Sequence, residues 1–381
     1  MFMLKSVPLG APRLARSLQT FGVLDSQINV LRNGKTIIAQ GTGGRASRTG
    51  YTVTVFGAPG TLGTALVTKL AKHGTITVCP YRDEYFKRHL KPTGDLGVVN
   101  FKEFDLRNVA SIETAVKHSD VVVNCIGRDY ETKHFKFHDV NVEGTRRIAE
   151  AVAKYAVPRF IHVSSHSATH DSPSAFLRTK AAGEEVVREI IPDSTIVRPA
   201  PIYGYNGYNW LQKMAGSRLT FTASGGQEIS YPTHVNDVAS ALEKMVYDDS
   251  TTGKIYELNG PESWSKKEIF DRIKSEVKRD FQFVNIPKPL LRAWATFLQY
   301  AAYWQGPLSP DEVERMFISQ AGGELSEGAY GYSDLGIFPG KLSENITHLV
   351  RHHRNPVYIA DSTETDKLRR KERDAWANIV D

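Results

Sequence analysis

Residues 57–63 read Gly-Ala-Pro-Gly-Thr-Leu-Gly and follow directly on the apolar run Thr52–Phe56. The residues behind them, 61–73, carry leucines at helical spacing, which predicts an amphipathic helix. A glycine loop between a strand and a helix is typical of a dinucleotide site, because backbone can approach a pyrophosphate there and the helix N-terminus attracts the anion. The stretch therefore predicts a Rossmann-type start to the fold.

Each glycine of the loop has its own expected role. We assign Gly57 to the tight turn and Gly60 to the close approach of backbone to the phosphates. Gly63 is assigned to the packing of the helix against the strand. A glycine-rich turn that binds nothing is the alternative interpretation.

Short apolar runs alternate with longer amphipathic stretches along the rest of the chain. Strands are expected at 52–56, 75–79, 98–104, 120–126, 159–163 and 253–258, and helices at 61–73, 109–118 and 139–155. Repeated strand–helix–strand units with right-handed crossovers build a parallel sheet with helices on both faces. The expected fold class is α/β, a Rossmann-type doubly wound parallel sheet with a smaller, mainly helical C-terminal cap domain.

The composition divides the chain into four expected parts. The first is a transit peptide and linker, 1–50, because its seven basic residues face a single acid, Asp25. An NADP(H)-binding domain is expected over 51–260, with folded structure beginning near residue 51, and the cap over 261–350. The last part, 351–381, is a charged tail and candidate partner-binding arm. A basic tail of no consequence is the alternative for the first part.

Charge and hydropathy exclude several classes of protein. The net charge of +6 comes without an aromatic-basic stripe or zinc spacing, so no nucleic-acid partner and no metal site are expected. No run is long and apolar enough for a transmembrane helix. The densest apolar stretch, 290–308, is interrupted by polar residues and predicts a buried or partner-facing helix, with peripheral membrane contact as the minority interpretation. Both cysteines, Cys79 and Cys125, lie in apolar runs, which fits a reducing compartment.

The end of the second strand indicates which dinucleotide binds. An NAD-preferring site places an acid there for the ribose hydroxyl, whereas this chain has Arg82, whose guanidinium could hold a 2′-phosphate. An ordinary surface arginine is the alternative. Asp105-Leu106 and Cys125-Ile-Gly127 follow later strands and should border the same crevice, since ligands lie at the carboxyl ends of parallel strands.

Motifs in a fixed order resemble the extended and atypical short-chain dehydrogenase/reductase family. They are the glycine loop, Asp105-Leu106, Ile161-His-Val-Ser-Ser165, Arg198-Pro-Ala-Pro-Ile-Tyr-Gly204 and His234-Val-Asn-Asp-Val-Ala239. With this resemblance the candidate cofactor-binding residues are Gly57, Ala58, Pro59, Gly60, Thr61, Leu62, Gly63, Arg82, Asp105, Leu106, Cys125, Ile126, Gly127, Val163, Ser164, Ser165, Lys180, Pro199 and Ile202.

Four further segments are similar to the family of nucleotide-binding accessory subunits of mitochondrial respiratory complex I, NADH:ubiquinone oxidoreductase. They are Pro80-Tyr-Arg82, His89–Gly97, Ile126–Lys133 and Leu177–Glu184. This resemblance implies a bound NADPH, a place on the matrix side of the inner membrane, and other subunits of complex I as partners. The cap and tail match less specifically.

One residue departs from the catalytic pattern of the dehydrogenase family. Enzymes of this family use a tyrosine four residues before a lysine on one helix, and that tyrosine passes a proton. Lys180 fits the lysine, but Phe176 stands at the tyrosine position and has no ionisable proton. We therefore expect no catalytic residue and a non-catalytic, NADPH-holding subunit. The alternative is an active NADP-dependent reductase or epimerase on a small carbonyl or sugar, with His166 or His170 replacing the tyrosine.

Overall fold

The computed structural model describes residues 28–358, apart from 32–33, 42–46, 206–209, 218, 223, 280–281, 302–308 and 321–324, together with Lys367, Lys371 and Arg373. The expectations for residues 1–27, for the second part of the apolar stretch and for most of the charged tail lie outside the described residues.

A seven-stranded parallel sheet forms the centre of the protein, in the order β13-β8-β7-β6-β3-β4-β5. Its strands are β3 (Thr52–Phe56), β4 (Ile76–Tyr81), β5 (Val99–Glu103), β6 (Val121–Asn124), β7 (Arg159–Val163), β8 (Thr195–Pro199) and β13 (Ile255–Leu258). The expected doubly wound fold class is confirmed, and β8 is a strand that the sequence pattern did not single out.

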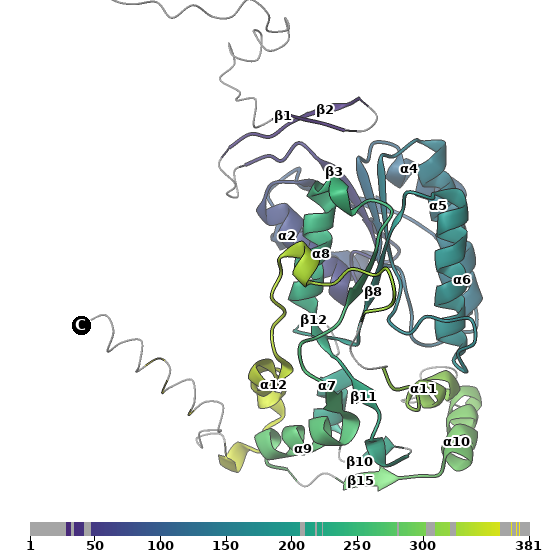
Figure 1. The fold of residues 1–381 in the computed structure, drawn as a ribbon, viewed down its shortest axis with the longest axis vertical. Coiled ribbons are helices and arrows are strands. Elements are labelled where there is room, and N and C mark those ends of the chain that lie inside the picture. The colour runs from purple at the N-terminus through teal and green to yellow at the C-terminus, as the bar shows by residue number, and fades with distance from the viewer. Residues whose placement is uncertain are drawn as a thin grey trace, which may run out of the picture.

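Helices cover both faces of this sheet (Figure 1). One face carries α2 (Thr61–Lys72) and α8 (Val235–Tyr247), and the other carries α4 (Val109–Val116), α5 (Gly144–Lys154) and α6 (Ala175–Ile190). All four residues of β6 are buried, because a central strand of such a sheet faces apolar helices on both sides. This explains why the segment Val121–Val123 is uniformly apolar.

The order of strands reverses at β3, which lies between β4 and β6. On one side of β3 the sheet continues through β4 to β5, and on the other side it continues through β6 to β7, β8 and β13. In open parallel sheets the carboxyl ends of the two strands at such a reversal leave a crevice in which ligands bind. The glycine loop follows β3 and therefore lies at this crevice.

The N-terminal boundary expected near residue 51 is wrong. An antiparallel hairpin of β1 (Ile28–Val30) and β2 (Thr36–Ile38) precedes it, and Leu31 and Ile37 are each only 3% exposed within the main core. Lys35 forms an ion pair with the buried Asp120 at 2.7 Å. The segment carries apolar residues on both sides of Asn33-Gly34, which is a hairpin signal, but the basic composition of residues 1–50 favoured the interpretation as a transit peptide.

The cap is not a continuous C-terminal block as expected. Its helices α7 (Trp210–Gly216), α9 (Lys266–Val277) and α12 (Leu342–Val350) share one apolar core, and β10 (Leu219–Thr222) pairs in parallel with β15 (Gln282–Asn285). Residues before 260 therefore contribute to it. Conversely, Tyr330 bridges to Tyr256 of β13, and Tyr332 and Leu335 pack into the core of the sheet.

Two further helices complete the cap. Helix α10 (Lys288–Ala301) packs against α11 (Pro310–Arg315), which lies beside the N-terminus of α6 (Figure 1). The expected helix in the apolar stretch is α10, and its Leu290, Trp294 and Phe297 are more than half exposed. In the part of the chain that the structure describes, every helix is too short or too polar to span a bilayer.

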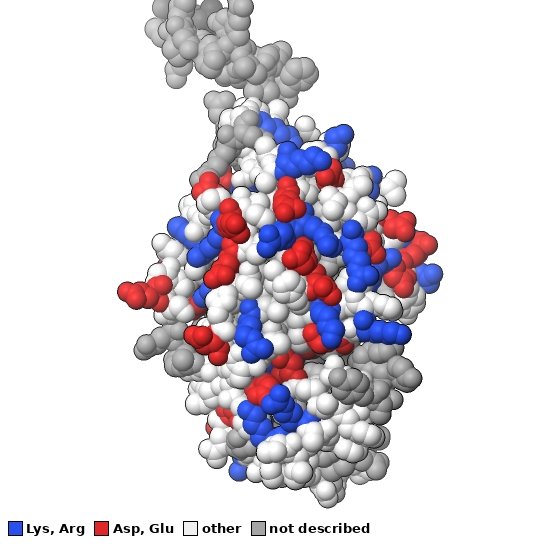
Figure 2. Space-filling view, turned by 90° about the vertical axis from the view of Figure 1, so that its right-hand side faces the viewer, with Lys and Arg blue, Asp and Glu red and all other residues white. Residues whose placement is uncertain are grey.

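Basic and acidic side chains are interspersed on the face formed by α4, α5 and α6 (Figure 2). Lys154 pairs with Glu113 at 2.7 Å, which joins α5 to α4 across this face. Nucleic-acid sites instead gather lysine and arginine into one patch. This face therefore lacks the electrostatic footprint of a nucleic-acid surface.

Candidate functional site

The glycine loop forms a tight turn at the carboxyl end of β3. Gly57 has φ +80°, and a Cβ there would lie 2.9 Å from the carbonyl of Cys125, which follows β6. A Cβ on Gly63 would lie 2.2 Å from the carbonyl oxygen of Gly57, so α2 can approach the turn this closely only with glycine. Gly60 is exposed and leads into the N-terminus of α2. These positions match the turn and packing roles expected of the loop.

A cavity of about 1000 Å³ opens beside this turn, between the sheet and the cap. The candidate residues that line it are Leu62, Cys125, Gly127, Val163, Ser164, Ser165, Lys180, Pro199 and Ile202. They come from the starts of α2 and β9 (Ile202–Tyr203), from α6 and from the ends of β6, β7 and β8. Residues distant in sequence are thus brought together at the expected edge of the sheet.

The remaining candidates border the crevice or pack beneath it. Arg82 follows β4 and is exposed, and Asp105 follows β5 and accepts a hydrogen bond from the Arg107 amide at 2.7 Å. The side chain of Leu106 instead lies in the core, against the Cα of Gly144. A contact between Leu106 and a ligand would therefore come from its backbone.

Lys180 is a buried cation at the centre of the cavity wall. It is 4% exposed, and its Nζ donates to the carbonyls of Val163 at 3.2 Å and Ile126 at 3.4 Å. Burial lowers its pKa from 10.5 to about 8. Nearby, the buried hydroxyl of Ser164 has no hydrogen-bond partner among the described residues. A buried hydroxyl without a partner is costly and indicates that something polar is to be bound there.

Phe176 lies one helical turn before Lys180 and also lines the cavity. Its ring packs edge-on against Phe137 at 5.8 Å between centroids. The guanidinium of Arg315 lies over the same ring, 4.8 Å from its centroid. The position where a proton-passing tyrosine would stand is therefore occupied by an apolar ring under a cation.

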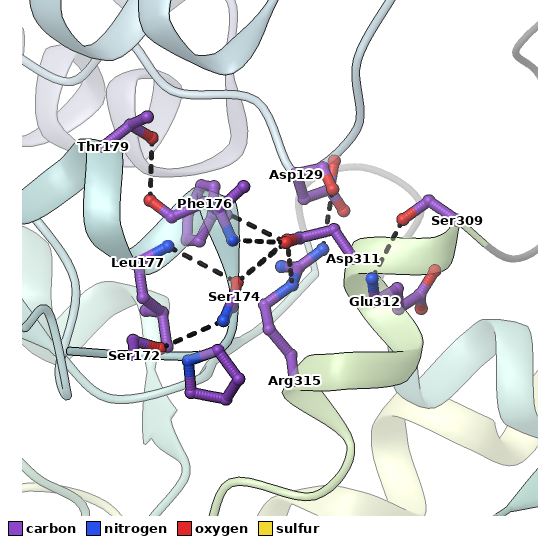
Figure 3. A network of polar contacts seen from close by, with 12 residues as sticks. Asp129, Ser172, Ser174, Phe176, Leu177, Thr179, Ser309, Asp311, Glu312 and Arg315 are labelled. Atoms are coloured by element: carbon purple, nitrogen blue, oxygen red, sulfur yellow. Dashed lines mark hydrogen bonds and ion pairs between the residues drawn. The ribbon is translucent and has the colours of Figure 1, made fainter. Parts of the chain in front are cut away.

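A polar network fastens α11 of the cap to the N-terminus of α6 (Figure 3). The carboxylate of Asp311 accepts from the Ala175 amide at 2.7 Å and from the Ser174 hydroxyl at 2.9 Å. It also pairs with Arg315 at 3.4 Å, and Arg315 donates to the Asp129 carbonyl at 2.7 Å. We call Ser174, Phe176, Asp311 and Arg315 the cap latch, because they join the two parts of the protein over the cavity.

Asp311 and Arg315 were not predicted from the sequence. Ser309-Pro-Asp-Glu312 carries a local signal, since serine caps α11 by accepting from the Glu312 amide and proline occupies its first turn. That signal predicts a helix start and says nothing of what the helix contacts.

The arginine of the Arg198-Pro motif has structural partners. Its guanidinium pairs with Glu184 of α6 at 2.7 Å and with Glu257 of β13 at 3.2 Å. The hydrogen bonds that the guanidinium donates to Glu184, and secondly the one that it donates to Glu257, raise the pKa of Arg198 despite its burial. The motif thus joins α6 to β13, the edge strand of the sheet.

The two histidines considered as replacement proton donors differ in position. His166 lines the cavity, hydrogen bonds Ser167 at 2.9 Å and has a pKa lowered by burial. His170 is exposed and pairs with Glu185 at 2.8 Å. It is not among the residues that line the cavity, so only His166 is near the site.

These residues fit a nicotinamide dinucleotide. The glycine turn has room for a ligand only because it lacks side chains, since a Cβ at Gly57 or Gly63 would meet backbone. The buried hydroxyl of Ser164 has no hydrogen-bond partner among the described residues, and the buried Lys180 supplies a cation to the same cavity. Arg82 would meet the adenosine phosphate, whereas Lys180 and Ser164 would meet the nicotinamide end. The bound group would supply hydride chemistry, and no proton donor occupies the Phe176 position.

The fold and the glycine turn together define a protein of the Rossmann class with a cap domain. The UDP-glucose 4-epimerase of Thermus thermophilus in complex with NAD has the same fold, with a TM-score of 0.60 and 17% identity over 80% of this chain and 99% of that one. The sequence model of the NAD dependent epimerase/dehydratase family matches residues 53–258.

Two curated relatives match most of the chain. The NADH-ubiquinone oxidoreductase 40 kDa subunit, mitochondrial, of Neurospora crassa is 47% identical over 349 residues, 92% of each chain. The NADH dehydrogenase [ubiquinone] 1 alpha subcomplex subunit 9, mitochondrial, of Mus musculus is 34% identical over 341 residues, 87% of this chain and 88% of that one. The chain belongs to the NAD dependent epimerase/dehydratase family and, within it, to the family of NADH-ubiquinone oxidoreductase subunits that these relatives represent. This confirms the resemblance found in the motifs.

Proposed function

We propose that the chain is an accessory subunit of mitochondrial NADH:ubiquinone oxidoreductase that holds NADPH as a structural cofactor and does not turn it over. Membership of the complex is supported by relatives whose names place them in it. The absence of turnover is carried by one observation, which is that Phe176 lines the cavity one helical turn before Lys180. An apolar ring there closes the usual route for the proton that must accompany hydride transfer.

A nucleotide that is not consumed still has a physical use. A ligand that binds only the folded chain stabilises it by several kcal/mol when its concentration is far above its Kd. The glycine loop follows β3, Cys125 follows β6 and Arg82 follows β4, so a bound dinucleotide would contact strands on both sides of the reversal at β3. We assign the cofactor this role in assembly and stability of the complex.

The preference for NADPH over NADH rests on Arg82. It stands directly after β4, is exposed, and has no hydrogen bond or ion pair that would occupy its guanidinium among the described residues. A charge-assisted contact with a 2′-phosphate is worth about 1.5–3 kcal/mol. We expect Arg82→Ala to weaken NADPH by roughly ten- to a hundredfold and NADH hardly at all. The matched control is Arg88→Ala, which removes another exposed arginine, one that stacks on Tyr85.

The localisation follows from the same proposal. We place the subunit at the matrix side of the inner membrane as a peripheral protein, with other subunits of the complex as its partners. Ahead of the hairpin, residues 1–27 carry Lys5, Arg13 and Arg16 against the single acid Asp25, and this composition supports a transit peptide and this route. Partner contact is assigned to the charged segment 351–381 and to α10, and peripheral membrane contact is proposed for α10.

The decisive experiment is to purify the assembly that contains the chain, denature it and identify the nucleotide released. We expect one NADPH for each chain, in equal amount before and after the complex has oxidised NADH with a ubiquinone analogue. Loss or oxidation of the NADPH during turnover would contradict the structural role. The active reductase or epimerase would then be the better hypothesis, and His166→Gln would test whether His166 is its proton donor.

A further inference from the structure

A cluster of basic side chains lies at the end of α9, where the chain that follows α12 packs against it. That chain begins with the 3₁₀ helix η7 (Arg351–His353), and the Asn355 amide donates to the Val277 carbonyl of α9 at 3.0 Å. Figure 1 shows α9 far from the central sheet. The cluster comprises Lys278, Arg279, Arg351, His352, His353 and Arg354, none of which lines the cavity beside the glycine turn. We call these residues the basic cluster.

The guanidinium of Arg354 is buried in this cluster without an acceptor. The residue is only 4% exposed, and neither its Nε nor its Nη2 has a hydrogen-bond partner among the described residues. The Nε2 atom of the neighbouring His353 is buried without such a partner as well. An arginine keeps its charge inside a protein, so unmatched donors of this kind lower stability unless something binds to them. They therefore indicate an acceptor that a ligand supplies.

The surroundings of His353 indicate which charge that ligand carries. The ring of His353 lies 4.0 Å from the ring of His352, measured between their centroids. Burial lowers the pKa of His353, and the positive charges of a protonated His352 and of Arg279 lower it further. The charges that act on this side chain are thus positive, and they would attract an anion.

Few acids accompany the basic cluster. The last acid of α9, Glu276, pairs with Arg272 at 3.2 Å. The three arginines of the cluster have no ion pair among the residues that the structure describes. Asp280 follows in the sequence and lies outside those residues. An anion from solution would therefore supply a negative charge that the described part of the chain does not.

A phosphate group matches the cluster in geometry as well as in charge. The Nε and Nη2 atoms lie on one side of a guanidinium, where their N–H groups form a fork that fits two phosphate oxygens. These are the two atoms of Arg354 that are buried without an acceptor. A phosphate monoester carries about −1.5 to −2 charges at pH 7 and has three terminal oxygens, so one oxygen remains for neighbouring donors. We propose that the basic cluster binds a phosphate group, which Arg354 holds through this fork and which the exposed Arg279 and Arg351 attract.

Two kinds of molecule carry such a group, and the border of the cluster admits both. Val357 and Tyr358 are 79% and 41% exposed, and the Nζ of Lys278 lies 5.2 Å from the centroid of the Tyr358 ring. A lipid that carries the phosphate would find apolar surface for its chain at these side chains, whereas a free phosphate ion needs only the basic cluster. The arginine fork recognises the phosphate in either case, so the two sources are separated by experiment.

Calorimetric titration of the purified full-length protein with inorganic phosphate, at constant ionic strength, tests the free ion. We expect one saturable binding event for each chain, with acetate at least about tenfold weaker. Arg82→Ala should leave this event unchanged, because Arg82 lies at the cofactor crevice. An event that is lost in Arg82→Ala would place the phosphate in the crevice and overturn the proposal. This comparison also keeps failure of the phosphate site distinct from failure of the structural NADPH role.

Sedimentation with vesicles tests the lipid. If the phosphate belongs to a lipid, the protein should sediment with vesicles of phosphatidylcholine and phosphatidic acid and stay in solution with phosphatidylcholine alone. Saturable binding of inorganic phosphate without such sedimentation assigns the site to the free ion. If neither probe binds, the proposal is overturned.

Substitutions connect the binding to the basic cluster. Arg354→Lys keeps the charge but removes the fork, so the Kd of the phosphate probe, free or in vesicles, should rise at least about tenfold. Arg351→Gln removes an exposed charge and should weaken binding about threefold. Lys267→Gln removes an exposed charge at the other end of α9 and is the matched control, which should bind as the native protein does.

The melting temperature of Arg354→Lys shows whether this variant folds. Native affinity in the folded variant would mean that general charge attraction, and not the fork, binds the probe, and would overturn the proposal. If Arg354→Lys does not fold, Arg351→Gln decides, because its side chain is exposed. Native affinity in Arg351→Gln would then place the phosphate outside the basic cluster.

Discussion

Removal of the Asp311 carboxylate should release the cap from the sheet. In the native protein this carboxylate accepts from the Ala175 amide at 2.7 Å and the Ser174 hydroxyl at 2.9 Å, both at the first turn of α6. It also pairs with Arg315, whose guanidinium covers Phe176. Asp311→Ala therefore breaks every contact that the carboxylate makes within the cap latch.

The magnitude follows from these contacts. A hydrogen bond to a charged group contributes about 1.5–3 kcal/mol, and two short ones are lost. Ser174 is fully buried and the Asp311 side chain is only 13% exposed, so water replaces little of what is removed. We expect Asp311→Ala to lower the free energy of cap opening by about 3–5 kcal/mol. Asp311→Asn keeps one acceptor and should cost about 1–2 kcal/mol.

Hydrogen exchange of the α11 amides measures this opening directly. Asp311→Ala should accelerate exchange there by at least about a hundredfold, while β6 and β7 stay protected. The control is Glu314→Gln on the same helix, because Glu314 pairs with Lys288 and Arg292, which are 41% and 64% exposed. Such pairs contribute at most about 1 kcal/mol. Exchange within about twofold of native in Asp311→Ala would refute the reasoning.

Three further predictions concern the loop, the hairpin and the buried lysine. Gly63→Ala should lower stability by about 1–3 kcal/mol in thermal denaturation, because its Cβ would lie 2.2 Å from a carbonyl oxygen, whereas Gly60→Ala, with its nearest atom at 3.2 Å, should fold normally. A chain beginning at residue 51 should melt well below one beginning at residue 28, since it lacks two buried side chains worth about 1.5–3 kcal/mol each; equal melting temperatures would contradict the packing of the hairpin. Burial lowers the pKa of Lys180 to about 8, so between pH 8 and 10.5 the unfolded chain binds more protons than the folded one. The free energy of unfolding of the nucleotide-free protein should therefore rise across that window, by at most about 3 kcal/mol. Lys180→Met should abolish the rise, and a rise that persists in this variant would show that another group causes it.

Local pattern was sufficient for most of the sheet. The run Val121–Val123 predicts a doubly buried strand because only such a strand is apolar at every position. Similarly, Arg159–Val163 was predicted with the bounds that the structure has. The hairpin at 28–38 escaped prediction although Asn33-Gly34 between apolar residues is a hairpin signal, because the basic composition of residues 1–50 favoured a transit peptide instead. The mixed composition of the cap escaped it because the pairing of β10 with β15 joins segments about sixty residues apart.

The residues of the candidate site likewise divide into those that local sequence predicts and those that it does not. Gly57, Gly63, Ser164 and Lys180 lie at strand ends or on one helix, where spacing along the chain translates directly into position. Asp311 reaches α6 from the far part of the chain, and nothing in the sequence near Ser174 indicates which acid will cap it. Long-range partners of this kind depend on how two domains dock, which local propensity does not encode.

The return of Tyr330, Tyr332 and Leu335 to the sheet has a consequence for the order of folding. The edge strand β13 and the core beneath it are completed only by residues that leave the ribosome, or cross a membrane, after most of the cap has passed. A chain emerging N-terminus first thus carries an unfinished sheet edge until about its last seventh arrives. Such an edge can pair with other chains in the meantime, so we expect this protein to need more protection from aggregation during synthesis than a fold whose core closes early.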